Sequence, residues 1–139
     1  MGFQLRDHTA DIGVEATGES LEAVFAAVAD GLAAASCESI PDGTGERFSV
    51  SVTAESPEAL LFDFLDELIY LRDVRMALPV DHRVEAIDRL GEEGWRLEGS
   101  AREIPLEEIT AREIKAVTYS EMRLEEVDDG WEAYVVFDV

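Results

Sequence analysis

Two carboxylates, an imidazole, a hydroxyl group and a glycine occur together near the start of the chain, in Asp7-His8-Thr9-Ala10-Asp11-Ile12-Gly13. Carboxylate oxygens bind hard cations, and carboxylates and imidazoles can also transfer protons. Apolar residues follow at alternate positions and predict a strand, at Ile12, Val14 and Ala16. The heptapeptide is therefore either an elaborate turn or a functional site at the start of a strand.

A second group of carboxylates lies at the far end of the sequence, in Phe137-Asp138-Val139. The dipeptide Asp129-Gly130 predicts a two-residue hairpin turn, which would place Glu121 opposite Asp138. Like charges directly across a ladder repel each other, so this pairing requires a bound cation or a bulge that changes the register. The terminal carboxylate of Val139 would add oxygen ligands of the kind that calcium and magnesium prefer. In so acidic a chain, the same groups can also be ordinary surface residues.

Lys115 is the only lysine, and all other side chains of the Lys+Arg class are arginine. A lysine ammonium is a compact charge with freely rotating donors, suited to contact a phosphate or a carboxylate. The alternative is that one lysine has been retained by chance.

Other catalytic and binding motifs do not match this sequence. Gly43 and Gly45 are not followed by the Lys-Ser/Thr pair of a phosphate-binding loop, and no serine lies in a nucleophile elbow. Cysteine and histidine show no metal-binding spacing. Asp7 and Asp11 could form a general acid/base pair, but nothing in the sequence distinguishes a buried acid from an exposed one. Catalysis by this chain alone has little support.

The composition limits the function further. The 139 residues suit one domain, spanning 1–139, and carry 32 acidic against 11 basic residues for a net charge of −21. An acidic surface almost without lysine is typical of adaptation to high salt, where screening suppresses repulsion between carboxylates. This predicts a halophilic source. The same charge disfavours autonomous nucleic-acid binding, which requires clustered Lys and Arg.

The single cysteine, Cys37, excludes an internal disulfide and predicts a reducing, cytoplasmic location. It follows an alanine-rich helix, where a small buried side chain is expected. We expect neither a signal peptide nor a membrane-spanning segment, because no apolar run is long enough.

Periodicity predicts the elements that position these residues. Apolar spacing predicts one helix over 20–36 and a second that starts at Ser56-Pro57 and extends over residues 60–73. Alternation predicts strands on both sides of the heptapeptide and over 48–54, 84–90, 95–102, 114–127 and 131–138. The order is strand, helix, strand, helix and four strands, which predicts a single two-layer α+β domain with two helices on a largely antiparallel sheet. His82 is expected at the surface. Along the outer side of the second helix, either a solvated face or a docking surface is formed by Asp63, Asp66, Glu67, Tyr70 and Asp73.

Taken together, these motifs resemble the archease family over essentially the whole chain. The resemblance rests on the heptapeptide, the helix start at 20–25, the helix at 60–73, Glu113-Ile114-Lys115-Ala116-Val117-Thr118-Tyr119 and the final Phe137-Asp138-Val139. It implies a small α+β protein that is not an enzyme but an accessory factor of the RtcB-type RNA ligase in tRNA splicing. Such factors promote transfer of GMP from GTP to the ligase histidine and allow multiple turnover. GTP would be met only within the ligase complex.

The resemblance also implies a divalent metal ion, calcium above all, held by Asp11, Asp138 and Val139. Lys115 would act with Asp11 and Asp138 in ligase activation, while His8, Thr9 and Asp7 would support the site. Ser120 departs from the pattern, because a histidine commonly follows the tyrosine in this family. Two other functions remain open: a chaperone-like module that binds basic clients through its acidic helix face, with a purely structural metal, and an aspartate-dependent phosphohydrolase.

Overall fold

The computed structural model describes residues 2–7, 11–42 and 45–139. In chain order the elements are β1 (Gly2–Asp7), β2 (Asp11–Gly18), α1 (Leu21–Ser36), β3 (Arg47–Ala54), α2 (Pro57–Arg75), β4 (Ala77–Arg89), β5 (Trp95–Pro105), β6 (Ala116–Val127) and β7 (Gly130–Asp138). This order confirms the prediction of strand segments, a helix, a strand, a helix and four strands. Among the described residues, no helix is long and apolar enough to cross a membrane.

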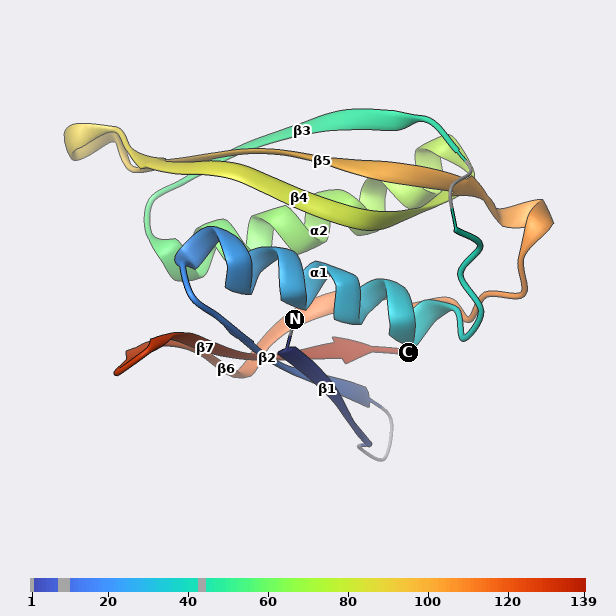
Figure 1. The fold of residues 1–139 in the computed structure, drawn as a ribbon, viewed down its shortest axis with the longest axis horizontal. Helices are drawn as coiled ribbons and strands as arrows, with labels where there is room; N and C mark the ends of the chain where they lie inside the picture. The colour runs from blue at the N-terminus through green and yellow to red at the C-terminus, as the bar shows by residue number, and fades with distance from the viewer. Residues whose placement is uncertain (1, 8–10, 43–44) are drawn as a thin grey trace.

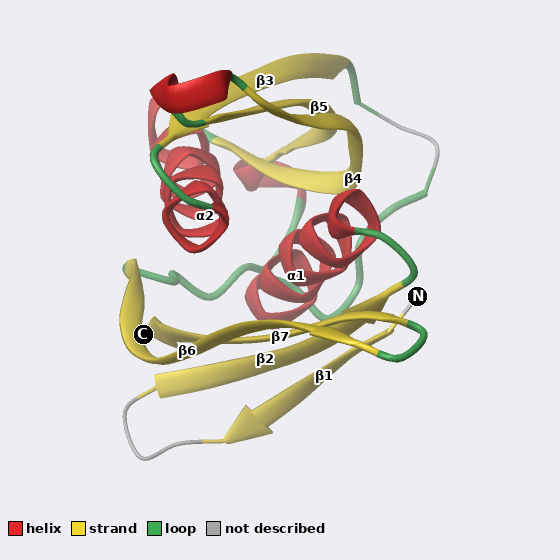
Figure 2. Cartoon of the chain, turned by 90° about the vertical axis from the view of Figure 1, so that its left-hand side faces the viewer, coloured by secondary structure: helices red, strands yellow, loops and turns green. Residues whose placement is uncertain are grey.

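The strands form two antiparallel sheets, and both helices lie between them (Figures 1 and 2). One sheet has the order β1-β2-β7-β6 and the other the order β3-β5-β4. Helix α1 packs on β2 and β4, and α2 packs on β3 and β6, so each helix contacts both sheets. The α+β class and the packing of two helices on antiparallel strands are confirmed. The single sheet of the expected two-layer arrangement is instead two sheets, which makes the helices a middle layer.

Helix α1 is buried on both sides, as its position between the two sheets requires. All residues from Val24 to Ala29 are buried in succession, whereas a helix with one apolar face would expose some of them. Its small side chains allow close approach on both sides: a Cβ on Gly31 would lie only 2.5 Å from a Val14 methyl carbon of β2. Cys37, at the end of the helix, is buried as expected.

Both helices begin at the serines that the sequence indicated. The Oγ of Ser20 accepts a hydrogen bond from the Ala23 N–H at 3.1 Å, and Ser56 caps α2 in the same way. Pro57 occupies the first turn of α2, where a missing N–H costs nothing. Strand β4 begins at Ala77, seven residues before the predicted strand over 84–90, and includes Pro79. A proline is tolerated there because β4 lies at the edge of its sheet.

The register of the last two strands differs from the prediction. Val127 pairs with Gly130, so Asp128 and Asp129 form the turn rather than Asp129 and Gly130. A register shift between Thr118 and Arg123 then moves Ala116 opposite Asp138. Glu121 lies within this shift, with φ 59°, a conformation that is costly for a residue with a Cβ. The predicted Glu121–Asp138 pairing was therefore wrong, and the bulge named as its alternative is present.

Candidate functional site

Asp11 and Asp138 lie directly opposite each other on β2 and β7, the two central strands of the four-stranded sheet. Side chains of paired residues in an antiparallel ladder project from the same face. The neighbouring pair, Ile12 and Phe137, is buried in the core, so the two carboxylates project from the outer face. Asp11 is half-buried and Asp138 is exposed. The fold thus brings together two acids that are far apart in the sequence.

Lys115 lies beside this pair. Its backbone N–H donates a hydrogen bond of 2.8 Å to the carbonyl oxygen of Asp138, and the next residue, Ala116, pairs with Asp138 across the ladder. The lysine is exposed, while the preceding Ile114 is completely buried. Val139 follows Asp138 and packs, partly buried, against the core. Three of the predicted site positions, those of Asp138, Val139 and Lys115, are therefore neighbours, and Asp11 is paired with one of them.

The rest of the heptapeptide is described only in part. His8 and Thr9 lie outside the described residues, so their supporting roles stay predictions. Asp7 ends β1 with its backbone opposite Ile12, and its role as a side chain likewise stays a prediction. The glycine has a packing role, because a Cβ on Gly13 would collide with the Tyr134 side chain. Gly13 leaves the space that this ring occupies on the outer face, two residues from Asp11.

Arg72 is a residue of this region that sequence reasoning missed. It lies in α2 and is buried, and its Nη1 donates to the carbonyl oxygen of Ile114 at 2.8 Å. Its Nε and Nη2 donate to a carboxylate oxygen of Asp73 at 3.1 and 3.0 Å. One signal was available in the sequence: Arg72 follows Leu65 and Leu68 at helical spacing, on the apolar face of α2. A charged residue at such a position indicates a specific buried partner.

The donor set at the aspartate pair fits a hard divalent cation. Two carboxylates held opposite each other repel, and a cation between them would remove the repulsion. Calcium takes six to eight oxygen ligands, from carboxylates, main-chain carbonyls and water. Within the described ranges, no group of three or more His, Cys, Asp and Glu side chains is arranged to hold a metal. Among the described residues, further ligands would therefore be oxygens of another kind, such as a main-chain oxygen of Val139.

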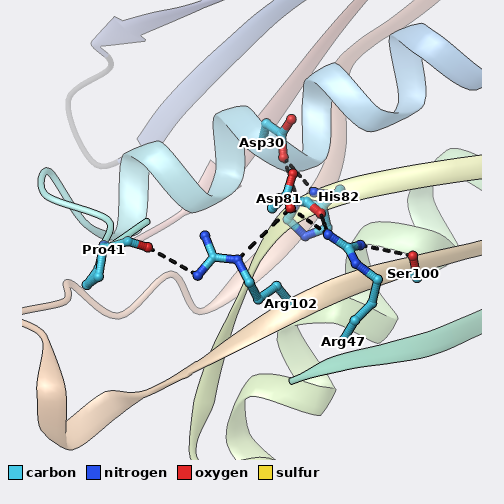
Figure 3. A network of polar contacts seen from close by, with 7 residues as sticks. All are labelled: Asp30, Pro41, Arg47, Asp81, His82, Ser100 and Arg102. Atoms are coloured by element: carbon cyan, nitrogen blue, oxygen red, sulfur yellow. Dashed lines mark hydrogen bonds and ion pairs between the residues drawn. The ribbon is translucent and has the colours of Figure 1, made fainter. Parts of the chain in front are cut away.

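A second polar network lies between α1 and the other sheet (Figure 3). Asp30 of α1 accepts hydrogen bonds from the His82 backbone N–H at 3.0 Å and contacts His82 Nδ1 at 2.8 Å. Arg47 binds the carboxylate and carbonyl of Asp81 and donates to Ser100 Oγ at 2.9 Å. The prediction that His82 is a surface residue was wrong, since its side chain is only 2% exposed. A register shift between Val80 and Arg83 turns it inward.

This network fixes α1 against a bulge in β4 rather than forming an open charged site. Asp81 has φ 49°, and the guanidinium of Arg47 holds it in that conformation. An open hollow of about 670 Å³ adjoins the network and is lined by side chains of both charges, among them Asp30, Arg47, Asp81, Arg83 and Arg102. With Asp42 counted, the lining has as many aspartates as arginines, so the hollow presents no excess of either charge.

The outer face of α2 is both acidic and aromatic. The Phe62 ring stacks on Tyr119 of β6 with 4.0 Å between centroids, and Tyr119 remains 57% exposed. Partial desolvation and the carboxylates of Asp66 and Glu55 raise the pKa of Asp63. Partial desolvation and the carboxylates of Asp63 and Glu55 raise the pKa of Tyr119. Anionic groups are thus crowded around an exposed ring at this face.

Comparison with known proteins agrees with the fold and with the motifs. The Archease protein family (MTH1598/TM1083) matches residues 3–139. The archease of Thermococcus gammatolerans is 39% identical over 137 residues, which cover 96% of this chain and 95% of that protein. The solution structure of Methanobacterium thermoautotrophicum protein 1598 superposes with a TM-score of 0.85 at 33% identity and covers 99% of both chains. The crystal structure of an archease, a possible chaperone, from Thermotoga maritima gives a TM-score of 0.64 at 28% identity, covering 96% of this chain and 94% of that one. The chain therefore belongs to the archease family, as its motifs had indicated.

Proposed function

We propose that this archease activates an RtcB-type RNA ligase in tRNA splicing, in the cytoplasm, by promoting guanylylation of the ligase histidine and repeated turnover. The observation that carries the proposal is the pairing of Asp11 with Asp138, with Lys115 hydrogen-bonded to the backbone of Asp138. Two carboxylates on the outer face of the sheet, with a lysine whose backbone adjoins one of them, can orient a metal ion and phosphate groups. Nucleotidyl transfer requires mainly such positioning and charge neutralisation from a protein.

In this proposal, the chain is an accessory factor and not an enzyme. Asp11, Asp138 and oxygens of Val139 would hold a divalent ion, calcium above all, which when bound supplies positive charge to phosphate oxygens. The exposed Lys115 would contact a phosphate or a carboxylate of the ligase complex through its ammonium group. The net charge of −21 disfavours direct binding of RNA or free GTP, so GTP is met only within that complex.

The direct test is a guanylylation assay with purified ligase and GTP. Adding this chain is expected to raise the rate of GMP transfer to the ligase and to increase the number of ligated RNA molecules per ligase. Lys115→Ala is expected to reduce this stimulation at least about tenfold, because it removes one charge-assisted contact. The matched control is Arg83→Ala, which removes an exposed cation from the opposite sheet and should stimulate like the wild type. Equal rates of GMP transfer with and without the chain would refute the proposal, as would turnover of a phosphoester by the chain alone.

A second candidate is a chaperone-like module that binds basic clients, with a purely structural metal. The crowded acidic and aromatic face of α2 favours it. Partial desolvation and the neighbouring carboxylates raise the pKa of Asp63, and an approaching cation would relieve the repulsion among these carboxylates. An exposed tyrosine flanked by carboxylates also suits an arginine of a partner.

The two candidates predict opposite rankings of variants. In the second, charge reversal by Asp63→Lys, Asp66→Lys and Glu67→Lys together should weaken client binding at least about tenfold, because three favourable charge contacts become repulsive. Loss of Asp11 should then have little effect. Binding of a basic client protein can be measured by titration calorimetry at fixed salt. A larger effect of Asp11→Ala than of the triple reversal would reject the chaperone-like function.

A further inference from the structure

The segment that crosses from the three-stranded sheet to the four-stranded sheet is held by two arginines. Residues 106–115 join β5 to β6 and carry Lys115 at their end. Arg112 donates its backbone N–H to Ser36 at 2.7 Å and its guanidinium to the carbonyl of Ala35, both at the last turn of α1. Arg72 of α2 donates to the carbonyl of Ile114 at 2.8 Å. The crossing is thus fastened to each helix by one guanidinium group.

The two attachments differ in their distance from the site. Arg112 lies three positions before Lys115 and is itself exposed, whereas Arg72 is buried and binds the peptide group that joins Ile114 to Lys115. The carbonyl of that peptide accepts from Arg72, and its N–H donates to the carbonyl of Asp138 at 2.8 Å. One peptide plane therefore connects Arg72 directly with the backbone of Asp138.

A buried guanidinium is costly unless each of its donors has a partner. Asp73 lies at the boundary of α2 with solvent, and its carboxylate accepts from both Nε and Nη2 of Arg72. This contact compensates the charge and also fixes the direction of the remaining arm toward Ile114. Apolar burial alone would not require an arginine here, since a leucine or methionine would fill the apolar face of α2 equally well.

We propose that Arg72, oriented by Asp73, is a positioning residue that sets the place of Lys115 relative to Asp138 and Asp11. The inference rests on the proposed function of Lys115, but the positioning itself can be measured without a ligase. If the bond to Ile114 fixes the peptide plane, removing it frees that plane to rotate and weakens the Lys115–Asp138 hydrogen bond. The lysine would then sample several positions beside the aspartate pair.

Residue-resolved amide hydrogen exchange by NMR tests this positioning. In Arg72→Met, which keeps most of the apolar volume, the Lys115 amide is expected to exchange about tenfold faster than in the wild type, relative to amides in β2 and β3. Arg72→Lys restores one donor and should recover part of the protection. The matched control, Arg112→Met, removes the other guanidinium from the same segment and should leave Lys115 protected. Equal acceleration of Lys115 in the Arg72→Met and Arg112→Met variants would overturn the proposal.

If Arg72→Met fails to fold, Asp73→Asn decides the question, because it keeps the arginine and weakens only its orienting partner. A two- to threefold faster exchange confined to residues near Lys115 is expected there, and unchanged exchange would overturn the proposal. The guanylylation assay adds a separate readout, in which Arg72→Met should lose stimulation and Arg72→Lys should partly regain it. If the wild type does not stimulate a ligase, the proposed function fails, while the exchange data still decide the role of Arg72.

Discussion

Replacing Asp138 by asparagine is expected to stabilise the metal-free protein and yet to abolish the activation of an RNA ligase that we propose for it. Asp138 and Asp11 face each other across a ladder, so each carboxylate destabilises the other by about 0.2–1 kcal/mol when no cation is present. Asparagine removes this repulsion at nearly constant shape, which corresponds to a melting temperature about 1–4 °C higher. The same change removes a ligand of the proposed metal site. Since loss of a mere supporting contact costs 10–100-fold in metal affinity, ligand loss should cost at least about tenfold.

Both effects can be measured on one set of samples. Thermal unfolding with a chelator gives the stability of the metal-free chain, titration calorimetry with calcium gives its affinity, and the guanylylation assay gives its activity. Asp11→Asn should behave like Asp138→Asn. The control is Glu132→Gln, which relieves a second like-charged pair, Glu125 with Glu132, on the same sheet. It should raise the melting temperature similarly but leave calcium affinity and ligase activation unchanged. Full activation by both asparagine variants would contradict the site.

Multimolar salt is expected to stabilise this chain strongly. A net charge of −21 on 139 residues produces repulsion that the unfolded, expanded chain largely escapes. The Debye length falls from about 10 Å at 0.1 M salt to about 3 Å at 1 M, so most of this repulsion disappears in that interval. We expect the melting temperature to rise by about 10 °C or more between 0.1 and 2 M KCl, equivalent to a few kcal/mol for a domain of this size.

The acidic face of α2 provides the control for screening. Asp63→Asn, Asp66→Asn and Glu67→Gln together remove three charges at a face where partial desolvation and neighbouring carboxylates raise the pKa of Asp63. This variant should be more stable than the wild type at low salt and should gain less from added KCl. A general solute effect would stabilise both proteins equally, and an unchanged melting temperature in the wild type would remove the support for a halophilic origin.

Local features of the fold could be predicted because local interactions determine them. Serine caps, a first-turn proline and apolar spacing placed α1 and α2 within a residue or two of their observed starts. The division into two sheets depends on non-local packing. The sequence hints at it in the unbroken apolar run over residues 24–29, all of which are buried. The register of β6 depends on a bulge that puts Glu121 at positive φ, and no glycine marks that position.

The candidate site could likewise be predicted in its local features and not in its non-local ones. Asp11, Asp138 and Lys115 were indicated by residue type, and the structure then showed their proximity through strand pairing. The position of Arg72 on the apolar face of α2 could have indicated a buried partner, but that partner is a carbonyl forty-two positions away, which the sequence of α2 does not identify. His82 was misplaced for a related reason, since Asp30 of α1 is what draws it inside.

The position of β7 between β2 and β6 also means that the candidate site forms only when the whole four-stranded sheet has folded. Asp138 belongs to β7, which is synthesised after the other described elements, and it meets Asp11 only when β7 pairs with β2, one of the first. Pairing of such distant segments is slow and comes late in folding. A nascent or partly unfolded chain therefore has no aspartate pair, and bound metal would stabilise only the finished domain. In this way, the partner would be activated only by intact molecules.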